Sequence, residues 1–444
     1  VGPYELRAAA SGFTAATIKG LDLQLNKNTT ANVTLQVGAV SASVDVTEAA
    51  AAIDTTTAQL QSSFEANQIV NLPIVENAQS FYGALNLSLL SAGVASNGGV
   101  GQGIGPSVGG QRPMENNFTI EGVDNNNKAL TGPLVYVPTD ATAEFTLMTN
   151  QYNAEFGHST GGQFNTVIKS GGNQFHGSLY EYFQNRNLNA LDALFANQGF
   201  TTSPRFDQNK LGVTFGGALI KDKLFYFGSM EYAPLGQAFT ATPVSAPTAA
   251  GYAQLGRLTG ISPANLKALQ QYLPTAPAAE DSTPVCPGVT SDVCGDPKAA
   301  VANRVAVPIG TLPVAGAFYN NFYSGLGSIN YNPSEKDQLR GRFIYNKSTS
   351  LDNTAVLPAF WTPLPQRWYL ATLSEIHTFS PSLTSETRLA FNRFSQYYTV
   401  PNGNFPGLDT FPTFDFDDLG IAVGPGAGPQ FTVLNTYQLV ENLN

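Results

Sequence analysis

The links between predicted strands alternate between short and long in the second part of the chain, and this constrains the fold most. Strands are predicted at residues 174–184, 208–219, 223–232, 324–331, 336–346, 366–379 and 383–395. The short links are 220–222, 332–335 and 380–382, and the long ones are 185–207, 233–323, 347–365 and 396 to about 432. Transmembrane β-barrels have tight turns at one rim and long loops at the other. A soluble β-sandwich has no reason to segregate its loops in this way, so the pattern favours a barrel.

Side chains within these strands alternate between apolar and polar. Leu339, Gly341, Phe343 and Tyr345 alternate with Gln338, Arg340, Arg342 and Asn346, and Leu383, Leu389 and Phe391 alternate with Glu386, Arg388 and Asn392. Ile344 interrupts the polar side of its strand. In a barrel the apolar set faces lipid and the polar set faces the lumen, whereas in a sandwich they face a core and water. Periodicity alone fits both folds, and the loop lengths favour the barrel.

The stretch EFTLMTNQYNAEFGHSTGGQFNTVIKSGGNQFHGSLYEYFQ, residues 144–184, predicts the passage from a compact domain into this barrel. A short strand is expected at 164–168, a turn at 170–173 and the first barrel strand from 175. Aromatic side chains crowd both faces of that strand, although a strand with one wet face normally alternates. We therefore expect one face to meet lipid and the other to pack on a domain that fills the lumen.

The first 170 residues predict two smaller units and a linker. Residues 1–47 alternate in places, at Leu21, Leu23 and Leu25 and again at Val33, Leu35 and Val37, which predicts half-buried strands of a partial β-sandwich. Residues 48–62 are small and polar and predict a linker. Residues 63–170 predict a mixed α/β domain with short helices at 63–71 and 80–90 and a glycine-rich loop at 97–110.

Composition excludes several classes of protein. The net charge is −10 and the sequence has no run of Lys or Arg, so it carries no electrostatic footprint for nucleic acid. Charged residues make up only 12%, which suits a β-protein whose surface is not entirely wet. No window is apolar enough for a transmembrane helix, so a membrane-spanning form must be a barrel. The fold class is therefore mainly β, with an incomplete antiparallel transmembrane β-barrel at residues 171–444.

Catalytic and metal-binding signals are weak. His158, His176 and His377 are far apart and none has Cys or carboxylates at metal-ligand spacing. No nucleophile and base are paired in the sequence, so we predict no enzymatic activity, no metal and no cofactor.

Cys286 and Cys294, the only cysteines, lie among turn residues in the longest predicted loop. They are either a disulfide-closed loop outside the cytosol or two unrelated thiols, and the turn-rich surroundings favour the disulfide. The same loop predicts a helix capped by Ser262, begun by Pro263 and ended before Pro274. An apolar stripe of Leu266, Leu269, Tyr272 and Leu273 indicates that the loop contains a folded insertion.

Four stretches resemble TonB-dependent outer-membrane transporters of the Oar-like type. They are the stretch 144–184, NLPIVENAQSFYGALNLSLLSAGV (71–94), GGQRPMENNFTIEGVDNNN (109–127) and FDQNKLGVTFGGALIKDKLFYFGSMEY (206–232). This family joins a carboxypeptidase-regulatory-like sandwich, a plug and a barrel. The resemblance implies that 63–170 is a plug inside the barrel, that the sandwich and plug are periplasmic and that the long loops are extracellular. Where the family usually has Asp-Gly in the plug, this chain has Glu121-Gly122.

The resemblance also implies transport of an unidentified ligand across the bacterial outer membrane, driven by TonB of the inner-membrane motor complex. We expect ligand contacts at plug residues Arg112, Glu115, Asn116, Asn117, Asp124, Asn125, Asn126 and Lys128. The TonB contact is expected at Val44, Asp45, Val46 and Thr47, an extended run that can add a strand to TonB. The same run can equally be the last strand of the sandwich.

An alternative function is a secreted or surface adhesion protein built from ligand-binding β-sandwiches. The α/β segment at 71–169 separates the two hypotheses, because a gated barrel needs a plug and a row of sandwiches does not. A plugged barrel needs about 22 strands, more than residues 171–444 supply, and the chain begins without Met. We therefore expect a fragment truncated at both ends, with a curved open sheet beside the plug.

Overall fold

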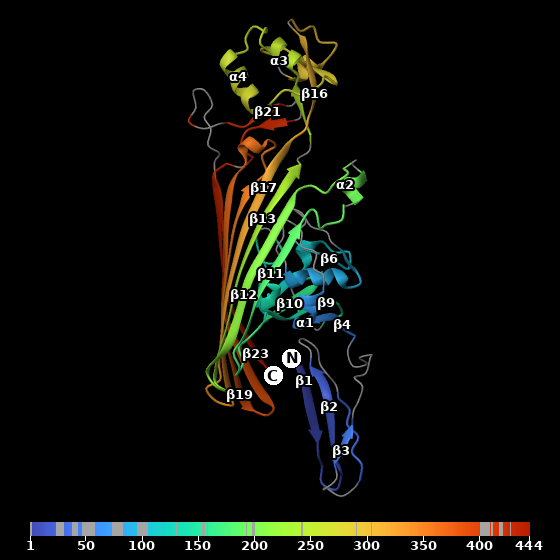
Figure 1. The fold of residues 1–444 in the computed structure, drawn as a ribbon, viewed down its shortest axis with the longest axis vertical. Helices are drawn as coiled ribbons and strands as arrows, with labels where there is room; N and C mark the ends of the chain where they lie inside the picture. Colours follow the sequence, from blue (N-terminus) through green and yellow to red (C-terminus); the bar gives the residue numbers. More distant parts are fainter. Residues whose placement is uncertain are drawn as a thin grey trace.

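A computed structural model places a long open β-sheet between a small N-terminal sheet and a cap of folded loops (Figure 1). The plug domain lies against one face of the long sheet. The structure describes residues 2–23, 31–37, 43–46, 58–72, 83–95, 105–129, 131–152, 156–157, 159–191, 193–197, 200–240, 243–289, 291–302, 304–399, 409, 412–416, 421–426 and 428–444.

The N-terminal sheet has three strands in the order β1-β2-β3. β1 (Gly2–Ala8) pairs antiparallel with β2 (Ala15–Leu23), and β3 (Ser43–Val46) pairs parallel with β2. The expected strand at Val33–Val37 is wrong, because residues 31–37 make only one bridge, between Phe13 and Val37. Val33 and Leu35 are less exposed than the polar residues between them, but Val37 is 85% exposed and these residues form no ladder. Leu25 lies outside the described residues.

The plug contains a five-stranded mixed sheet in the order β4-β9-β10-β7-β8. Its strands are β4 (Leu60–Glu65), β7 (Asn117–Ile120), β8 (Val123–Asp124), β9 (Thr142–Asn150) and β10 (Gln163–Ile168). The linker predicted to end at residue 62 ends earlier, because β4 already pairs with β9 from Leu60. The helix predicted from residue 63 begins only at Ala66, since the preceding residues belong to β4.

Short helices and a two-strand pair complete the plug. These elements are α1 (Ala66–Asn71), β5 (Val94–Ala95), β6 (Ser107–Val108) and the 3-10 helices η1 (Gly83–Leu90), η2 (Pro113–Glu115) and η3 (Thr139–Ala141). Three buried rings, Phe118, Phe145 and Phe164, stack at the centre, with centroids 4.8 and 6.2 Å apart. Ile69 of α1 and Leu87 of η1 pack into the same core, so these helices are held by burial rather than by length.

The long sheet is antiparallel, and its strands are neighbours in chain order. They are β11 (His176–Asn185), β12 (Phe206–Ile220), β13 (Leu224–Thr240), β17 (Ala315–Tyr331), β18 (Asp337–Asp352), β19 (Thr362–Ser380), β20 (Leu383–Tyr398) and β23 (Gln430–Leu443). All the predicted short links are confirmed. Several strands extend further toward the long loops than predicted; β13 continues to Thr240 and β17 begins at Ala315. Among the described strands, β11 and β23 each pair on one side only, so the barrel is incomplete.

The two faces of the long sheet separate as a transmembrane barrel requires. Phe343, Leu373 and Leu389 are about half exposed on the outer face. Ile344, which breaks the polar side of its strand, is fully buried and packs with plug residues. The first barrel strand follows the same rule, because Leu179 is exposed whereas Tyr180 is directed to the inner side and hydrogen bonds there.

The long-loop end of the sheet carries a folded cap. The insertion between β13 and β17 contains β14 (Val244–Pro247), α3 (Ala249–Leu255), α4 (Pro263–Tyr272), β15 (Asp281–Val285), α5 (Ser291–Gly295) and β16 (Val305–Leu312). The predicted helix is confirmed, with the Ser262 hydroxyl accepting the N–H of Asn265. A disulfide joins Cys286, which follows β15, to Cys294 in α5.

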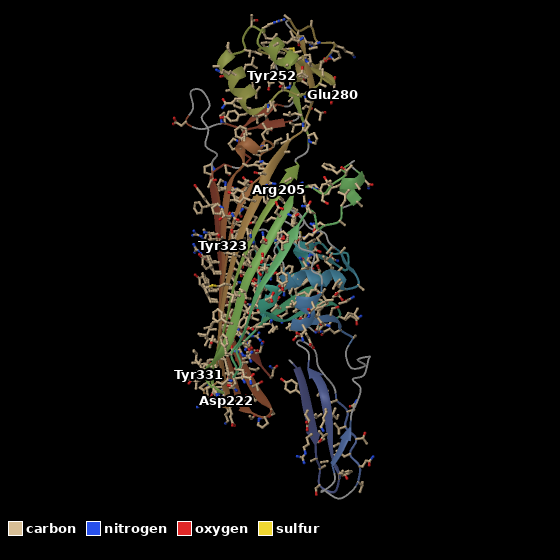
Figure 2. All side chains as sticks on the ribbon, viewed as in Figure 1. Arg205, Asp222, Tyr252, Glu280, Tyr323 and Tyr331 are labelled. Carbon is tan, nitrogen blue, oxygen red and sulfur yellow. A yellow bond between two sulfur atoms is a disulfide. The ribbon has the colours of Figure 1, made fainter. Side chains whose placement is uncertain are left out.

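Loops from neighbouring hairpins join the cap. They contribute η4 (Pro358–Phe360), β21 (Phe414–Phe416) and β22 (Ile421–Val423), while α2 (Ala193–Asn197) lies in the first long loop. Leu273 after α4, Trp361 after η4 and Val423 of β22 share one buried cluster. Tyr252, labelled in Figure 2, donates to the Leu273 carbonyl at 2.6 Å, and burial raises the pKa of its hydroxyl. The cap is therefore one packed unit built from separate loops.

No helix in the described part of the chain combines the length and the apolar character needed to cross a membrane.

Trp361→Ala should loosen the cap while leaving the barrel sheet folded. Trp361 is buried and its indole N–H donates to the Ala355 carbonyl at 2.8 Å, so truncation removes both packing and a hydrogen bond. We expect a loss of about 3–5 kcal/mol of local stability, read as faster protease cleavage of the cap in outer-membrane vesicles. Phe200→Ala, which removes a half-exposed ring in another loop, is the matched control. Equal cleavage rates for both variants would contradict the common core.

Candidate functional site

The plug contacts the inner face of the barrel sheet through an apolar cluster. Ile120, Leu134, Val135, Val137, Ala141 and Ile168 of the plug pack with Phe227, Leu326, Ile344, Leu370 and Phe394 of five barrel strands. All of these side chains are buried. An apolar contact of this kind holds the plug in place without directional bonds, so orientation must come from polar groups around it.

Tyr136 of the plug anchors the centre of this interface. Its backbone N–H donates to Asn346 Oδ1 on β18 at 2.8 Å, and its hydroxyl donates to Glu231 Oε1 on β13 at 3.0 Å. Tyr180 of β11 donates to the other oxygen of the same carboxylate, also at 3.0 Å. Because Glu231 is buried, two hydroxyl donors offset part of its desolvation. The three residues thus link the plug to both the first and the third strands of the barrel sheet.

Glu121 and Arg342 form an ion pair across the same interface. Glu121 lies in the two-residue turn between β7 and β8, where Glu121 and Gly122 both have positive φ, 49° and 77°. Such turns favour glycine at the second position. Glu121 Oε2 lies 3.2 Å from Arg342 Nε, and the Arg342 side chain is only 4% exposed. The acidic residue in the Glu121-Gly122 pair therefore neutralises a cation on the barrel wall.

A third contact lies beside β11. Tyr182 donates its hydroxyl to Asp140 Oδ2 at 2.9 Å, which joins the first barrel strand to η3 of the plug. Burial lowers the pKa of nearby Lys169, and the charge of Asp140 opposes that shift. The inward aromatics of β11 therefore lie beside the plug, Tyr182 through Asp140 and Tyr180 through the Glu231 carboxylate that it shares with Tyr136, as the sequence predicted.

The predicted ligand-contact residues divide into exposed and structural ones. The Arg112 side chain is 63% exposed and pairs with Glu115 at 3.1 Å, and Lys128, 46% exposed, pairs with Asp124 at 3.2 Å. Asn116 and Asn125 are buried instead. Asn116 bonds the Pro106 carbonyl and the Gly162 N–H, and Asn125 bonds both backbone groups of Val135. These two side chains stabilise plug loops through hydrogen bonds to the backbone.

Asn117, Asn126 and Asp124 form a connected half-buried group. The Asn126 amide donates to Asn117 Oδ1 at 2.7 Å, and Asp124 Oδ1 accepts the Asn126 N–H at 3.0 Å. The backbone of Asp124 also meets the barrel wall, through Gln438 and Asn392. This segment thus faces the wall of β20 and β23, and Arg112, Glu115 and Lys128 are the predicted residues that remain most open to a ligand.

The predicted TonB-contact residues lie in the N-terminal sheet. Val44, Asp45 and Val46 belong to β3, whose only partner among the described strands is β2, and Thr47 lies outside the described residues. The segment is therefore the third strand of this sheet, which agrees with the last-strand interpretation. No group of three or more potential metal ligands occurs in the residues that the structure describes.

Sequence reasoning missed the plug–barrel contacts made by Tyr136, Glu231 and Asn346. The polar lumen face of the strands was predicted, but nothing in the sequence pairs Asn346 with a residue 210 positions away. The one available signal was local, since Ile344 stands out as an apolar residue on a polar face.

Comparison with known proteins agrees with this arrangement. A family model described as an outer membrane beta barrel domain matches residues 167–444. Over 229 residues the chain is 26% identical to the TonB-dependent transporter Oar of Myxococcus xanthus, covering 51% of this chain and 21% of Oar. Among solved structures, the outer membrane transporter YddB of Escherichia coli has a TM-score of 0.53 at 14% identity, covering 86% of this chain and 45% of YddB.

The siderophore receptor PirA of Acinetobacter baumannii is similar at a TM-score of 0.50 and 12% identity, covering 85% of this chain and 44% of PirA. The chain thus spans about a fifth of Oar and less than half of these two structures. It belongs to the outer membrane β-barrel family, whose place is the bacterial outer membrane. The alternative of a β-sandwich adhesin loses its basis, because the strands form one continuous sheet with the plug on one face.

Glu121→Gln should destabilise the plug–barrel interface by about 3–5 kcal/mol, because it leaves the buried Arg342 without its counter-charge. The free energy of plug release is measurable by urea titration of the folded protein in detergent, followed by protease cleavage of the plug. Glu115→Gln breaks an ion pair with the exposed Arg112 and is the matched control, with an expected cost below about 1 kcal/mol.

The double variant Glu121→Gln/Arg342→Gln should recover much of that loss, because it removes both charges together. If Glu121→Gln costs no more stability than Glu115→Gln, the Glu121–Arg342 ion pair does not hold the plug.

Proposed function

We propose that the protein is a TonB-dependent transporter that moves an unidentified ligand across the outer membrane, with the plug as its gate. The observation that carries this proposal is the plug held on the inner face of the barrel sheet by the Glu121–Arg342 pair and the Tyr136 contacts. Its relatives are transporters and receptors rather than enzymes. Binding and movement, rather than covalent chemistry, are therefore the expected activities.

The position of β4 supports a gate that opens from its N-terminal side. β4 is the outer strand of the plug sheet and the one that follows the linker. Tension that enters at Leu60 acts first on the ladder between β4 and β9, because β9 is the only described strand that pairs with β4. The polar contacts of the plug with the wall suit such movement, because water can replace hydrogen bonds that open.

TonB would supply that tension through a short extended segment before the plug. Val44, Asp45, Val46 and Thr47 remain our candidates, because strand addition through the main chain needs no particular side chain. On the ligand side, we propose contacts with Arg112, Glu115 and Lys128, whose charged groups are the most open of the predicted set. The cap would form the outer part of the receptor.

Removing residues 60–168 from the full-length protein should open the barrel, because these residues contain the entire plug sheet. We expect planar-bilayer conductance and sensitivity of cells to a large hydrophilic antibiotic, neither of which the intact protein gives. Deletion of residues 244–312, which removes the inserted part of the cap, is the matched control and should leave the barrel closed. A plug-deleted barrel that conducts no more than the intact protein would contradict the proposal that the plug is the gate.

A synthetic peptide of residues 42–50 should bind the C-terminal domain of TonB by strand addition. Val46→Pro in that peptide removes one backbone donor, and we expect about tenfold weaker binding. Calorimetric titration measures both affinities. Val44→Ala, which keeps the backbone donor, should bind like the natural peptide. No binding by the natural peptide would place the TonB contact elsewhere in the chain.

A further inference from the structure

Three cations lie close together on the outer face of the barrel sheet, near its long-loop end. Lys347 of β18 is paired directly with Arg367 of β19, and Tyr369 of β19 is paired with Arg393 of β20. The three side chains therefore occupy two adjacent rows of three neighbouring strands. Directly opposite side chains in a sheet have Cβ atoms about 4.5–5.5 Å apart.

The alternation of each strand directs these three side chains away from the plug. Lys347 shares its face with Phe343, Arg367 with Leu373 and Arg393 with Leu389, and these apolar partners are 51%, 54% and 50% exposed. Residues of the opposite parity, such as Asn346, Leu370 and Phe394, are buried on the plug side. The cluster thus faces the surroundings of the barrel rather than its lumen.

Tyrosines place the cluster at the upper edge of the membrane. Tyr232 stacks on Tyr323 with centroids 4.5 Å apart, and Tyr345 meets Tyr369 at 5.0 Å. Along β17, Tyr323 is about 26 Å from Tyr331, from a rise of about 3.3 Å per residue, which is about 20 Å along the membrane normal when strands tilt by about 40°. An outer-membrane barrel has an apolar band about 25 Å tall between two aromatic girdles. Figure 2 shows Tyr323 on the outer side of the sheet and Tyr331 near the short turn at Asp222.

The three cations have no acidic partner among the residues that the structure describes. In the part of the chain that the structure describes, no ion pair involves Lys347, Arg367 or Arg393. Lys347 Nζ lies 5.8 Å from the centre of the Tyr323 ring, and Arg393 donates to the Asn435 side chain at 3.1 Å. Like charges directly opposite each other destabilise a sheet. Repulsion between Lys347 and Arg367 therefore destabilises the sheet, and an anion bound between the two side chains offsets this repulsion.

We propose that this cluster binds the phosphate-bearing headgroup of a lipid in the outer leaflet. Long loops of outer-membrane barrels are extracellular, so the upper girdle lies at the headgroup level of that leaflet. Arg binds phosphate with two parallel hydrogen bonds and Lys adds a point charge, which together suit a phosphate group. A soluble ligand on its way through the protein would meet the cap and the lumen instead, both of which lie off this face.

The test compares lipid retention by the full-length protein in two kinds of nanodisc. One contains phosphatidylcholine alone, and the other also contains lipid A, whose phosphates are monoesters. Lys347→Gln/Arg367→Gln/Arg393→Gln should lower lipid A retention, measured by native mass spectrometry. Each cation near an anionic surface strengthens binding about fivefold, so three account for on the order of a hundredfold. Lys347→Arg/Arg367→Lys, which keeps every charge, should retain lipid A.

The matched control is Lys221→Gln/Lys223→Gln/Lys336→Gln, which removes three exposed charges at the opposite rim. This variant should retain lipid A as the natural protein does, and heat-modifiable migration on gels checks that every variant is folded. Inorganic phosphate added in solution should not displace the lipid, because it lacks the acyl chains that the outer face contacts. Equal retention by the two triple variants, or displacement by inorganic phosphate, would overturn the proposal.

Discussion

Arg342 extends from the barrel wall toward the plug, and Glu121 meets it at 3.2 Å in a place with little water. A buried cation without this partner would cost several kcal/mol, so the wall depends on the plug as much as the plug depends on the wall. The surrounding contacts follow from this arrangement. Tyr136 fixes the plug to β13 and β18, and the apolar cluster around Ile344 fills the space between them.

This interface combines two kinds of contact with different consequences for motion. The apolar cluster is insensitive to small shifts in direction, whereas the ion pair and the tyrosine hydrogen bonds require a particular position. A gate needs both properties, since it must return to one closed position after each opening. The Asp124 backbone, which meets Gln438 and Asn392, shows that even the predicted ligand loop takes part in this positioning.

The barrel strands were largely predictable, because lipid on one side and a polar lumen on the other impose a period of two. The predictions ended early toward the long loops, where β13 runs to Thr240 and β17 begins at Ala315. Ile344 was visible as an exception but could not be explained without its plug partners. Asn116 and Asn125 looked like ligand contacts because buried amides and exposed ones are identical in sequence, and only the backbone around them distinguishes the two.

The folded cap also bears on how the sheet is assembled. Thr240 and Ala315 are the first pair of the ladder between β13 and β17, yet a long insertion separates them along the chain. If that insertion were a flexible coil, closing it would cost conformational entropy that grows with its length. In this protein the ladder between β14 and β16 pairs Val244 with Leu312 inside the insertion, which holds the two strand ends near each other. The strand pairing that encloses the longest connection in the long sheet then becomes an almost local one.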